Sequence, residues 1–174
     1  MKADLLIGLS AGYTLPEEIV KDLAPNPMIF ALANPNPEIL PYRAKQLRSD
    51  VLVATARPDF ANQIHNVMCF PFVYRAVLDT MSTEINMEMK MAAAEAIAKL
   101  ARDKVSNQAM QTAAGRTFDF GKDYFMPLLL DQRLMVSVAV AVAKAAESTE
   151  VAKRPIKDYK EYKAYLAKIV HHCL

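Results

Sequence analysis

The stretch that decides the fold reads MIFALANPNPEIL from Met28 to Leu40 and VLVATARPDFANQIHNVMCFPFVYRAVLDT from Val51 to Thr80. It contains two short apolar runs, Met28–Ala33 and Val51–Ala54, and small, polar or proline residues follow each of them. Short apolar runs that end in this way are typical of buried strands in a parallel sheet. Because ligands of open parallel sheets bind beyond the carboxyl ends of the strands, the residues that follow these runs are candidates for a ligand site.

A third apolar run, Leu5–Leu9, lies near the start of the chain, and we expect it to be a strand covered on both faces. A capping box at Thr14 and Glu17 predicts a helix that continues to about Leu23. A second helix is expected over Glu38–Leu47. Strands and helices that alternate at this spacing indicate parallel strands joined by helical crossovers.

The remainder of the chain is predicted to be helical. An apolar stripe at helical spacing marks one helix, and its members are Ile85, Met89, Ala93, Ala96, Ile97 and Leu100. The expected helices cover residues 71–81, 84–105, 132–148 and 158–170, with Asp131 and Asp158 as capping residues and a less regular segment over 107–130. The predicted fold class is therefore α/β, with a partial Rossmann-like parallel sheet of about three strands followed by several helices.

Glycine is scarce, and this limits the kind of sheet that is expected. The chain has only four glycines, and neither GxGxxG nor GxxxxGK occurs in it. A doubly wound dinucleotide-binding sheet carries such a loop in its first half. The sequence thus predicts half of a doubly wound sheet, without the phosphate-binding loop.

The composition is that of a soluble globular protein. A net charge of +2 without a cluster of basic residues argues against binding to nucleic acid. No leader sequence is recognised, and no apolar run approaches the ~20 residues that span a bilayer. The two cysteines, Cys69 and Cys173, form no disulfide framework, so we expect a cytoplasmic protein that contacts no membrane.

Asn34 is the strongest single candidate for a ligand-binding residue. It follows an apolar run, and its amide group carries both hydrogen-bond donors and an acceptor, as recognition of a ribose or of a nicotinamide amide requires. The alternative is that Asn34 forms an Asx-turn, which is common before proline. Spacing alone leaves both interpretations open.

A second group of polar residues stands just before a predicted helix and consists of Asn62, Gln63, His65 and Asn66. Such a group can bind a carboxylate or a carboxamide with the help of the helix N-terminus. The alternative is a polar loop that caps the helix. No second metal-ligating side chain stands near His65 at ligand spacing, which argues against a zinc site. No nucleophile, triad or carboxylate pair is recognised.

The sequence resembles the C-terminal part of the NAD(P)-binding domain of malic enzymes, in particular of the bacterial type. The similar segments are ADLLIGLSA (3–11), IFALANPNPEILP (29–41), ATARPDFANQIHNVMCFPFVYRAVLD (54–79), INMEMKMAAAEAIAKLAR (85–102), DQRLMVSVAVAVAKAA (131–146) and RPIKDYKEY (154–162). The resemblance covers nearly the whole chain, and we expect residues 1–174 to be the C-terminal portion of such a domain. It implies the oxidative decarboxylation of malate to pyruvate and CO2 with NAD or NADP and a divalent metal, Mg or Mn.

The resemblance also implies site residues. Asn34 matches the family's cofactor-contacting asparagine, Ser10 lies at the strand end that borders the cofactor, and Asn66 matches the amide that reaches nicotinamide and malate. The resemblance places the catalytic acid/base pair, the metal ligands and the glycine-rich loop upstream of Met1. No catalytic residue or metal ligand is therefore expected among these 174 residues.

Three loops depart from the family pattern. Ser10–Gly12 reads SAG where Ser-Ala-Pro or Ser-Gly-Pro is usual, Ala56–Asp59 reads ARPD where Gly-Arg-Ser-Asp is usual, and His65 replaces the first residue of an Asn-Asn pair. An imidazole does not offer the donors and the acceptor of an amide. We therefore expect the changes in these three loops to affect how tightly the cofactor binds.

Two interpretations follow. The chain is either a segment of an NAD(P)-dependent malic enzyme, inactive alone, or a non-catalytic remnant that serves as a binding or oligomerisation module. A sheet that ends at Leu5–Leu9 leaves an edge strand with unpaired amides, which favours association with another chain. The expected partner is a second copy or a complementing N-terminal half.

Overall fold

The computed structural model describes residues 2–104 and 119–173. They form two compact units. Residues 2–65 together with 119–128 make up the first, which we call the sheet unit, and residues 66–104 together with 129–173 make up the second, the helical unit. The chain passes from the first unit to the second between His65 and Asn66.

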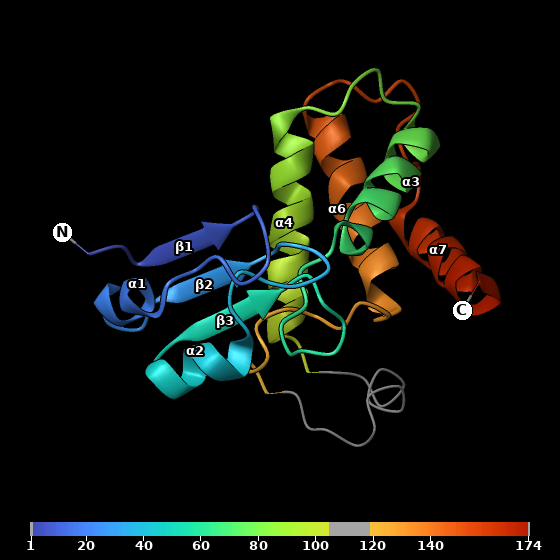
Figure 1. Cartoon of the computed structure of the whole chain (residues 1–174). Helices are drawn as coiled ribbons and strands as arrows, with labels where there is room; N and C mark the ends of the chain where they lie inside the picture. Colours follow the sequence, from blue (N-terminus) through green and yellow to red (C-terminus); the bar gives the residue numbers. More distant parts are fainter. Residues whose placement is uncertain (1, 105–118, 174) are drawn as a thin grey trace. The chain divides into compact units, whose positions relative to one another are not determined.

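The sheet unit is built on three parallel strands, β1 (Leu5–Gly8), β2 (Met28–Ala31) and β3 (Leu52–Thr55), in the spatial order β1-β2-β3 (Figure 1). Helix α1 (Glu17–Asp22) connects β1 to β2, and α2 (Pro41–Leu47) connects β2 to β3. The predicted α/β class and the three parallel strands are confirmed.

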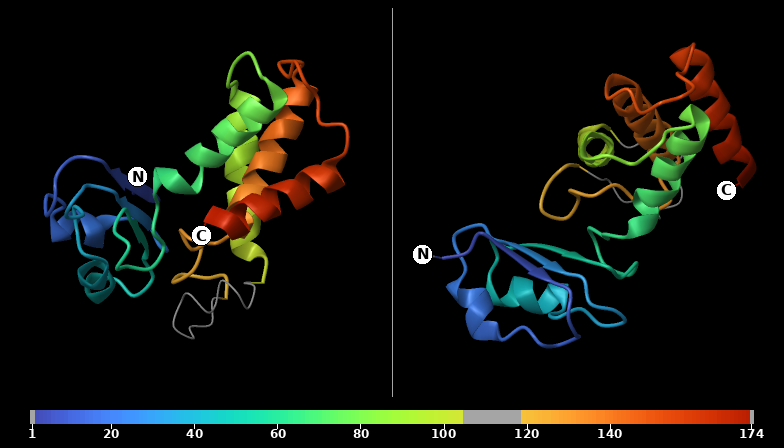
Figure 2. Two further views of the ribbon diagram at one scale, coloured as in Figure 1. Left: turned by 90° about the vertical axis from the view of Figure 1, so that its right-hand side faces the viewer. Right: turned by 90° about the horizontal axis from the view of Figure 1, so that it is seen from above.

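Both connecting helices pack on the same face of the sheet. Val20 of α1 and Ala44 of α2 share a buried core with Ile29 of β2 and Val53 of β3. Figure 2 gives two further views of these helices and strands.

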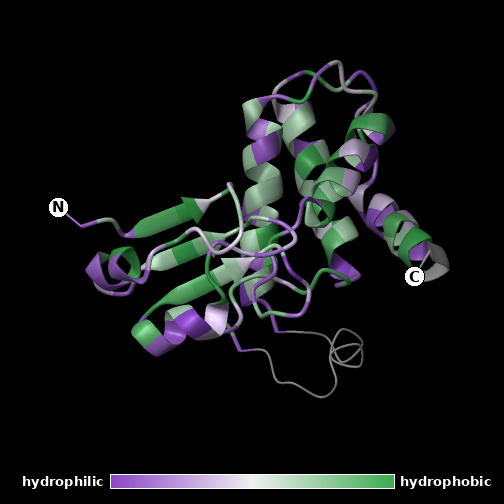
Figure 3. Ribbon diagram, viewed as in Figure 1, coloured by the Kyte–Doolittle hydropathy of each residue, from purple (hydrophilic) through white to green (hydrophobic). Residues whose placement is uncertain are grey.

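The opposite face of the sheet is only partly covered. Phe30 of β2 stacks on Phe125, with ring centroids 6.2 Å apart. On β1, however, Leu5 and Ile7 remain 41% and 55% exposed. These exposed side chains belong to a strand that Figure 3 colours mostly as hydrophobic. The expectation that the first strand is covered on both faces is therefore wrong for the described residues, because α1 and α2 lie on one face only.

The starts of the two connecting helices differ from the predictions. No capping box forms, because the Thr14 hydroxyl donates to the Ala11 carbonyl (2.7 Å) and Glu17 pairs with Arg43 of α2 (2.5 Å). The predicted helix over Glu38–Leu47 begins only at Pro41, whose fixed φ suits a first helical turn.

Arg48 and Asp50 connect two loops at the end of the sheet where β2 and β3 begin. The Arg48 guanidinium donates to the Leu23 and Ala24 carbonyls and pairs with Asp50 (2.6 Å). Asp50 also accepts a hydrogen bond from the Asn26 amide (2.8 Å). The loop before β3 is thereby joined to the loop before β2.

The Asp50 carboxylate gives the sheet unit a pH-dependent contribution to stability. Hydrogen bonds from Arg48 and from the Asn26 amide hold its pKa far below the ordinary value. A carboxyl with a lowered pKa stabilises the fold above its ordinary pKa of about 4, and the contribution is lost as the pH falls below that value. We expect Asp50→Asn to lower the midpoint of thermal unfolding at neutral pH, by a difference that shrinks below about pH 4.

Melting curves of both proteins at several pH values test this expectation. Asp22→Asn is the control, because the Asp22 carboxylate is 78% exposed and pairs with Lys2 at the surface. A wild-type advantage over Asp50→Asn that stays constant on acidification would contradict it.

The helical unit contains a short 3-10 helix η1 (Asn66–Met68) and four α-helices, α3 (Phe70–Thr80), α4 (Met87–Arg102), α6 (Arg133–Ser148) and α7 (Tyr159–Cys173). The apolar stripe predicted for α4 is confirmed, because Met89, Ala93 and Leu100 are buried. Across from it, Val138 and Val142 of α6 enter the same core.

The helix predicted over residues 132–148 is confirmed as α6. The amide of Arg133 donates to the Asp131 carboxylate (3.0 Å) at the start of α6, and the amides of Lys160 and Glu161 donate to Asp158 at the start of α7. Both predicted capping aspartates are confirmed. Residues 107–118 of the predicted irregular segment lie outside the described residues. Within the described ranges, no helix combines the length and apolar character needed to cross a membrane.

Candidate functional site

The candidate site lies in the sheet unit, where the strands end. Ser10 follows β1 and Asn34 follows β2, and both residues are exposed. Because β1 and β2 are adjacent and parallel, these two residues leave the sheet at the same edge. The Asn34–Pro35 peptide bond is cis. The structure thus brings two of the three predicted site residues to one edge.

A buried glutamate joins the loops that carry these two residues. Glu38 is 4% exposed, and its carboxylate accepts hydrogen bonds from the amides of Ser10 (3.0 Å) and Ala33 (3.2 Å). Each carboxylate oxygen thus accepts one backbone hydrogen bond. The sequence assigned Glu38 to a helix, and the only signal for its real position is that it follows two Asn-Pro pairs.

Two glycines permit the close approach of these loops. A Cβ at Gly8 would lie 2.4–2.8 Å from the Glu38 carboxylate atoms, and a Cβ at Gly12 would lie 2.7 Å from the Cβ of Asn36. Backbone hydrogen bonds from Tyr13 to Pro37 (2.9 Å) and from Leu15 to Glu38 (3.1 Å) hold the loops in this position. The edge is therefore tightly packed.

The loop after β3 adds a cation that is paired within the loop. Arg57 forms a two-pronged pair with Asp59 (2.8 and 2.5 Å), and this pair holds the pKa of Asp59 below its ordinary value. The guanidinium also lies 5.1 Å from the centre of the Phe60 ring and donates to the Asn36 side chain (3.4 Å). Arg57 thus connects the second and third loops.

Asn62 and Gln63 serve the structure of the sheet unit. Asn62 is buried; its side chain donates to the carbonyls of Val53 and Lys122 and accepts from the amide of Phe125 (2.8 Å). Gln63 donates to the carbonyl of Ala56 (3.1 Å). Asn62 thereby ties residues 119–128 to β3, a role that neither interpretation of the polar group predicted.

Asn66 belongs to the helical unit. It is exposed, it opens η1, and its carbonyl accepts the amide of Cys69 (3.0 Å). His65 is the last residue of the sheet unit before the boundary. The third predicted site residue is therefore carried by a different unit from Ser10 and Asn34.

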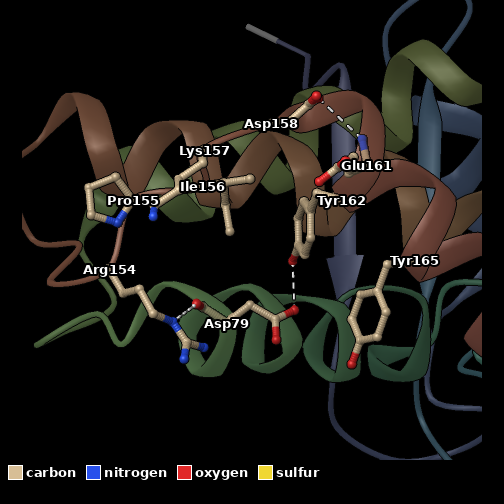
Figure 4. A pocket seen from close by; sticks show the side chains of 9 residues that line it. All are labelled: Asp79, Arg154, Pro155, Ile156, Lys157, Asp158, Glu161, Tyr162 and Tyr165. Atoms are coloured by element: carbon tan, nitrogen blue, oxygen red, sulfur yellow. Dashed lines mark hydrogen bonds between the residues drawn. The ribbon is translucent and has the colours of Figure 1, made fainter.

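The helical unit has a pocket of its own, of about 470 Å³, between α3 and the start of α7 (Figure 4). Asp79 lies at its base, where its carboxylate accepts from the Tyr162 hydroxyl (2.8 Å) and pairs with Arg75. Burial and this bond raise the pKa of Tyr162 well above its ordinary value. Arg154 donates to the Asp79 carbonyl (3.0 Å). Asp79 thus joins α3 to α7.

Among the described residues, no group of three or more His, Cys, Asp or Glu side chains is arranged to hold a metal ion. At the sheet edge the exposed residues Ser10 and Asn34 carry a neutral hydroxyl and a neutral amide. The charged groups near them are the buried Glu38 and the Arg57–Asp59 pair. The parallel strands with helical crossovers are those of a Rossmann-like α/β domain, a class in which ligands bind beyond the carboxyl ends of the strands.

Comparison with known sequences identifies the family. The sequence model described as "Malic enzyme, NAD binding domain" matches residues 1–112. The chain is 49% identical over 160 residues to an NAD-dependent malic enzyme of Rhizobium meliloti, covering 92% of this chain and 21% of that protein. It is 46% identical over 169 residues to an NADP-dependent malic enzyme of Salmonella typhimurium, covering 97% and 22%. The chain belongs to the malic enzyme NAD-binding domain family.

Solved structures agree with this assignment. The malic enzyme of Entamoeba histolytica superposes with a TM-score of 0.81 at 27% identity and covers 98% of this chain. The malic enzyme of Pyrococcus horikoshii gives 0.79 at 28% identity and covers 99%. This chain corresponds to 33% and 37% of those two chains, and it spans about a fifth of the two sequence relatives.

Proposed function

We propose that this chain forms the nicotinamide side of the cofactor site of an NAD(P)-dependent malic enzyme. The observation that carries the proposal is the pair of exposed residues Ser10 and Asn34 at the ends of adjacent parallel strands, in a chain of this family. In this proposal Asn34 and Ser10 contact the cofactor, and Asn66 contacts both the nicotinamide and malate.

The residues at the edge fit such a cofactor chemically. The Asn34 amide can donate to and accept from a ribose hydroxyl or the nicotinamide carboxamide, and the Ser10 hydroxyl can do the same. Arg57 is paired with Asp59, so the neutral side chains of Ser10 and Asn34 are the groups proposed to face the uncharged ribose hydroxyls and carboxamide of the cofactor. A bound nicotinamide supplies the redox chemistry, while this chain binds and orients it. The divalent metal ligands of the whole enzyme are proposed to lie outside this chain.

Nucleotide binding tests the proposal directly. We expect the chain to bind NAD or NADP weakly and Asn34→Ala to raise Kd about tenfold, because about 1.4 kcal/mol of hydrogen bonding is lost. Isothermal titration with both nucleotides measures this. Gln46→Ala is the matched control, because Gln46 is an exposed amide on α2. Equal affinities of the wild type and Asn34→Ala would contradict the proposed role of Asn34.

The isolated chain is expected to lack malate-dependent reduction of NAD or NADP. The proposal assigns the acid/base pair and the metal ligands to a part of the enzyme that this chain does not contain. Absorbance at the reduced-nicotinamide band, with malate and Mg or Mn added to highly purified protein, measures turnover. Measurable turnover that copurifies with the chain would refute this expectation.

The second candidate function is a non-catalytic binding or oligomerisation module. The observation in its favour is β1, an edge strand whose Leu5 and Ile7 are exposed in the described structure. Under either candidate we propose a cytoplasmic chain that associates with a second copy or with a complementing N-terminal half. Nucleotide binding separates the candidates, and a monomer in light scattering at high concentration argues against a second copy.

A further inference from the structure

We propose that Glu38 is the positioning residue of the cofactor edge, because its carboxylate holds the Ser10 loop and the Asn34 loop in one fixed arrangement. The inference rests on the proposed function insofar as Ser10 and Asn34 contact the cofactor. It assigns to Glu38 a role that needs no contact with the cofactor itself.

The hydrogen bonds of Glu38 show why the residue must be a carboxylate. Its Oε1 accepts the amide of Ser10 (3.0 Å) and its Oε2 accepts the amide of Ala33 (3.2 Å), the residue directly before Asn34. An ionised carboxylate offers acceptors on both oxygens, whereas a glutamine offers one oxygen and one NH2 donor. Glutamine at this position would therefore set a donor against one of the two amides.

The Glu38 side chain is closely packed, which leaves its carboxylate one position between the two loops. The side chain is buried at 4% exposure and fills the space beside Gly8, where a Cβ would meet all three carboxyl atoms at 2.4–2.8 Å. Gly8 is the last residue of β1, and its carbonyl accepts the amide of Leu32 (3.0 Å), the residue directly after β2. The carboxylate is thus enclosed between the two strand ends that it connects.

The backbone near Glu38 joins the same two loops. The Glu38 carbonyl accepts the amide of Leu15, and the neighbouring Pro37 carbonyl accepts the amide of Tyr13. These bonds do not involve the Glu38 side chain. A change confined to the carboxylate is therefore expected to leave the loops attached while it releases the amides of Ser10 and Ala33.

The test uses the full chain with Glu38→Gln and Gly8→Ala. Glu38→Gln preserves the shape of the side chain and removes one acceptor, whereas Gly8→Ala keeps the acid and displaces it. Glu18→Gln, at an exposed glutamate of α1, is the control. In proton–nitrogen NMR spectra, Glu38→Gln is expected to move the backbone amide signals of both Ser10 and Ala33, whereas Glu18→Gln is expected to leave both signals in place.

The positioning role predicts an effect on the site as well. Both variants are expected to broaden or average the Asn34 side-chain amide signals, leave the signals of core residues such as Val20 and Ile29 in place, and raise Kd for NAD or NADP about tenfold. A folded Glu38→Gln variant with wild-type affinity and unchanged Asn34 signals would overturn the proposal. If Glu38→Gln does not fold, the Gly8→Ala variant decides by the same criteria.

The outcome separates this inference from the proposed function. If the wild type binds neither nucleotide, the proposed function fails, and the Asn34 signals alone then decide on Glu38. Asn34 side-chain signals that broaden or average in Glu38→Gln support a positioning role, and unchanged Asn34 signals overturn it.

Discussion

Replacement of Asp79 by alanine is expected to destabilise the helical unit by about 3 kcal/mol, because it leaves a buried hydroxyl and a guanidinium without their common acceptor. Asp79 is 9% exposed and Tyr162 is 7% exposed, so water replaces little of the hydrogen bond between them, whereas the Arg75 side chain is partly hydrated. The change breaks the Arg75 pair on α3 and the hydrogen bond from Tyr162 on α7 at once. The attachment of α7 to α3 is weakened most.

Chemical denaturation monitored by circular dichroism measures this loss. Tyr162→Phe is the matched control, because it removes one hydrogen bond of Asp79 and keeps the Arg75 pair, and about 1 kcal/mol is expected for it. An Asp79→Ala variant no less stable than Tyr162→Phe would show that the ion pair contributes nothing. Hydrogen exchange should locate the loss of protection in α3 and α7.

Replacement of Asn62 by alanine is expected to destabilise the sheet unit by about 3 kcal/mol, because the buried amide is removed and three backbone groups lose their hydrogen-bond partner. Those groups are the carbonyls of Val53 and Lys122 and the amide of Phe125. Asn62 also has a φ of 55°, a left-handed conformation that asparagine tolerates better than alanine. The change therefore acts on both the hydrogen bonds and the backbone.

The neighbouring Gln63→Ala variant is the control for Asn62→Ala. Gln63 is only partly buried and its side chain donates one bond, to Ala56, so about 1 kcal/mol or less is expected. Hydrogen exchange at the amide of Ile64, which donates to Thr55, reports on the end of β3. If both variants lose the same stability, Asn62 does not hold residues 119–128 in the way described.

The fold could be predicted where the residue pattern of one segment is enough to determine its secondary structure. The three apolar runs predicted β1, β2 and β3, and the stripe through Met89, Ala93 and Leu100 predicted α4. These patterns depend on periodicity and burial, which act within a few residues. The polar caps at Asp131 and Asp158 are also local and were predicted for the same reason.

The predictions failed where a distant partner competes with a local one. Glu17 pairs with Arg43, 26 residues away, and so forms no capping box with Thr14. Glu38 binds the amide of Ser10, 28 residues away, and so begins no helix. A local motif indicates which hydrogen bonds a side chain can form, and tertiary contacts determine which of these bonds it does form.

The candidate site was predictable in part. The end of a parallel strand is enough to single out Ser10 and Asn34, which the structure places at one edge. The roles of Glu38 and Asn62 were hidden, because both residues act through backbone groups that carry no signal in the sequence. For Asn66 the function stays a prediction from the family resemblance.

The sheet unit is discontinuous, and this has a consequence for the order in which the protein is made. All three strands are complete by Thr55, but two of the three hydrogen bonds of the Asn62 side chain are made with Lys122 and Phe125, 60 and 63 residues further along. On the ribosome, α3 and α4 emerge between these partners. The first unit to begin folding therefore cannot finish until much of the second has been synthesised.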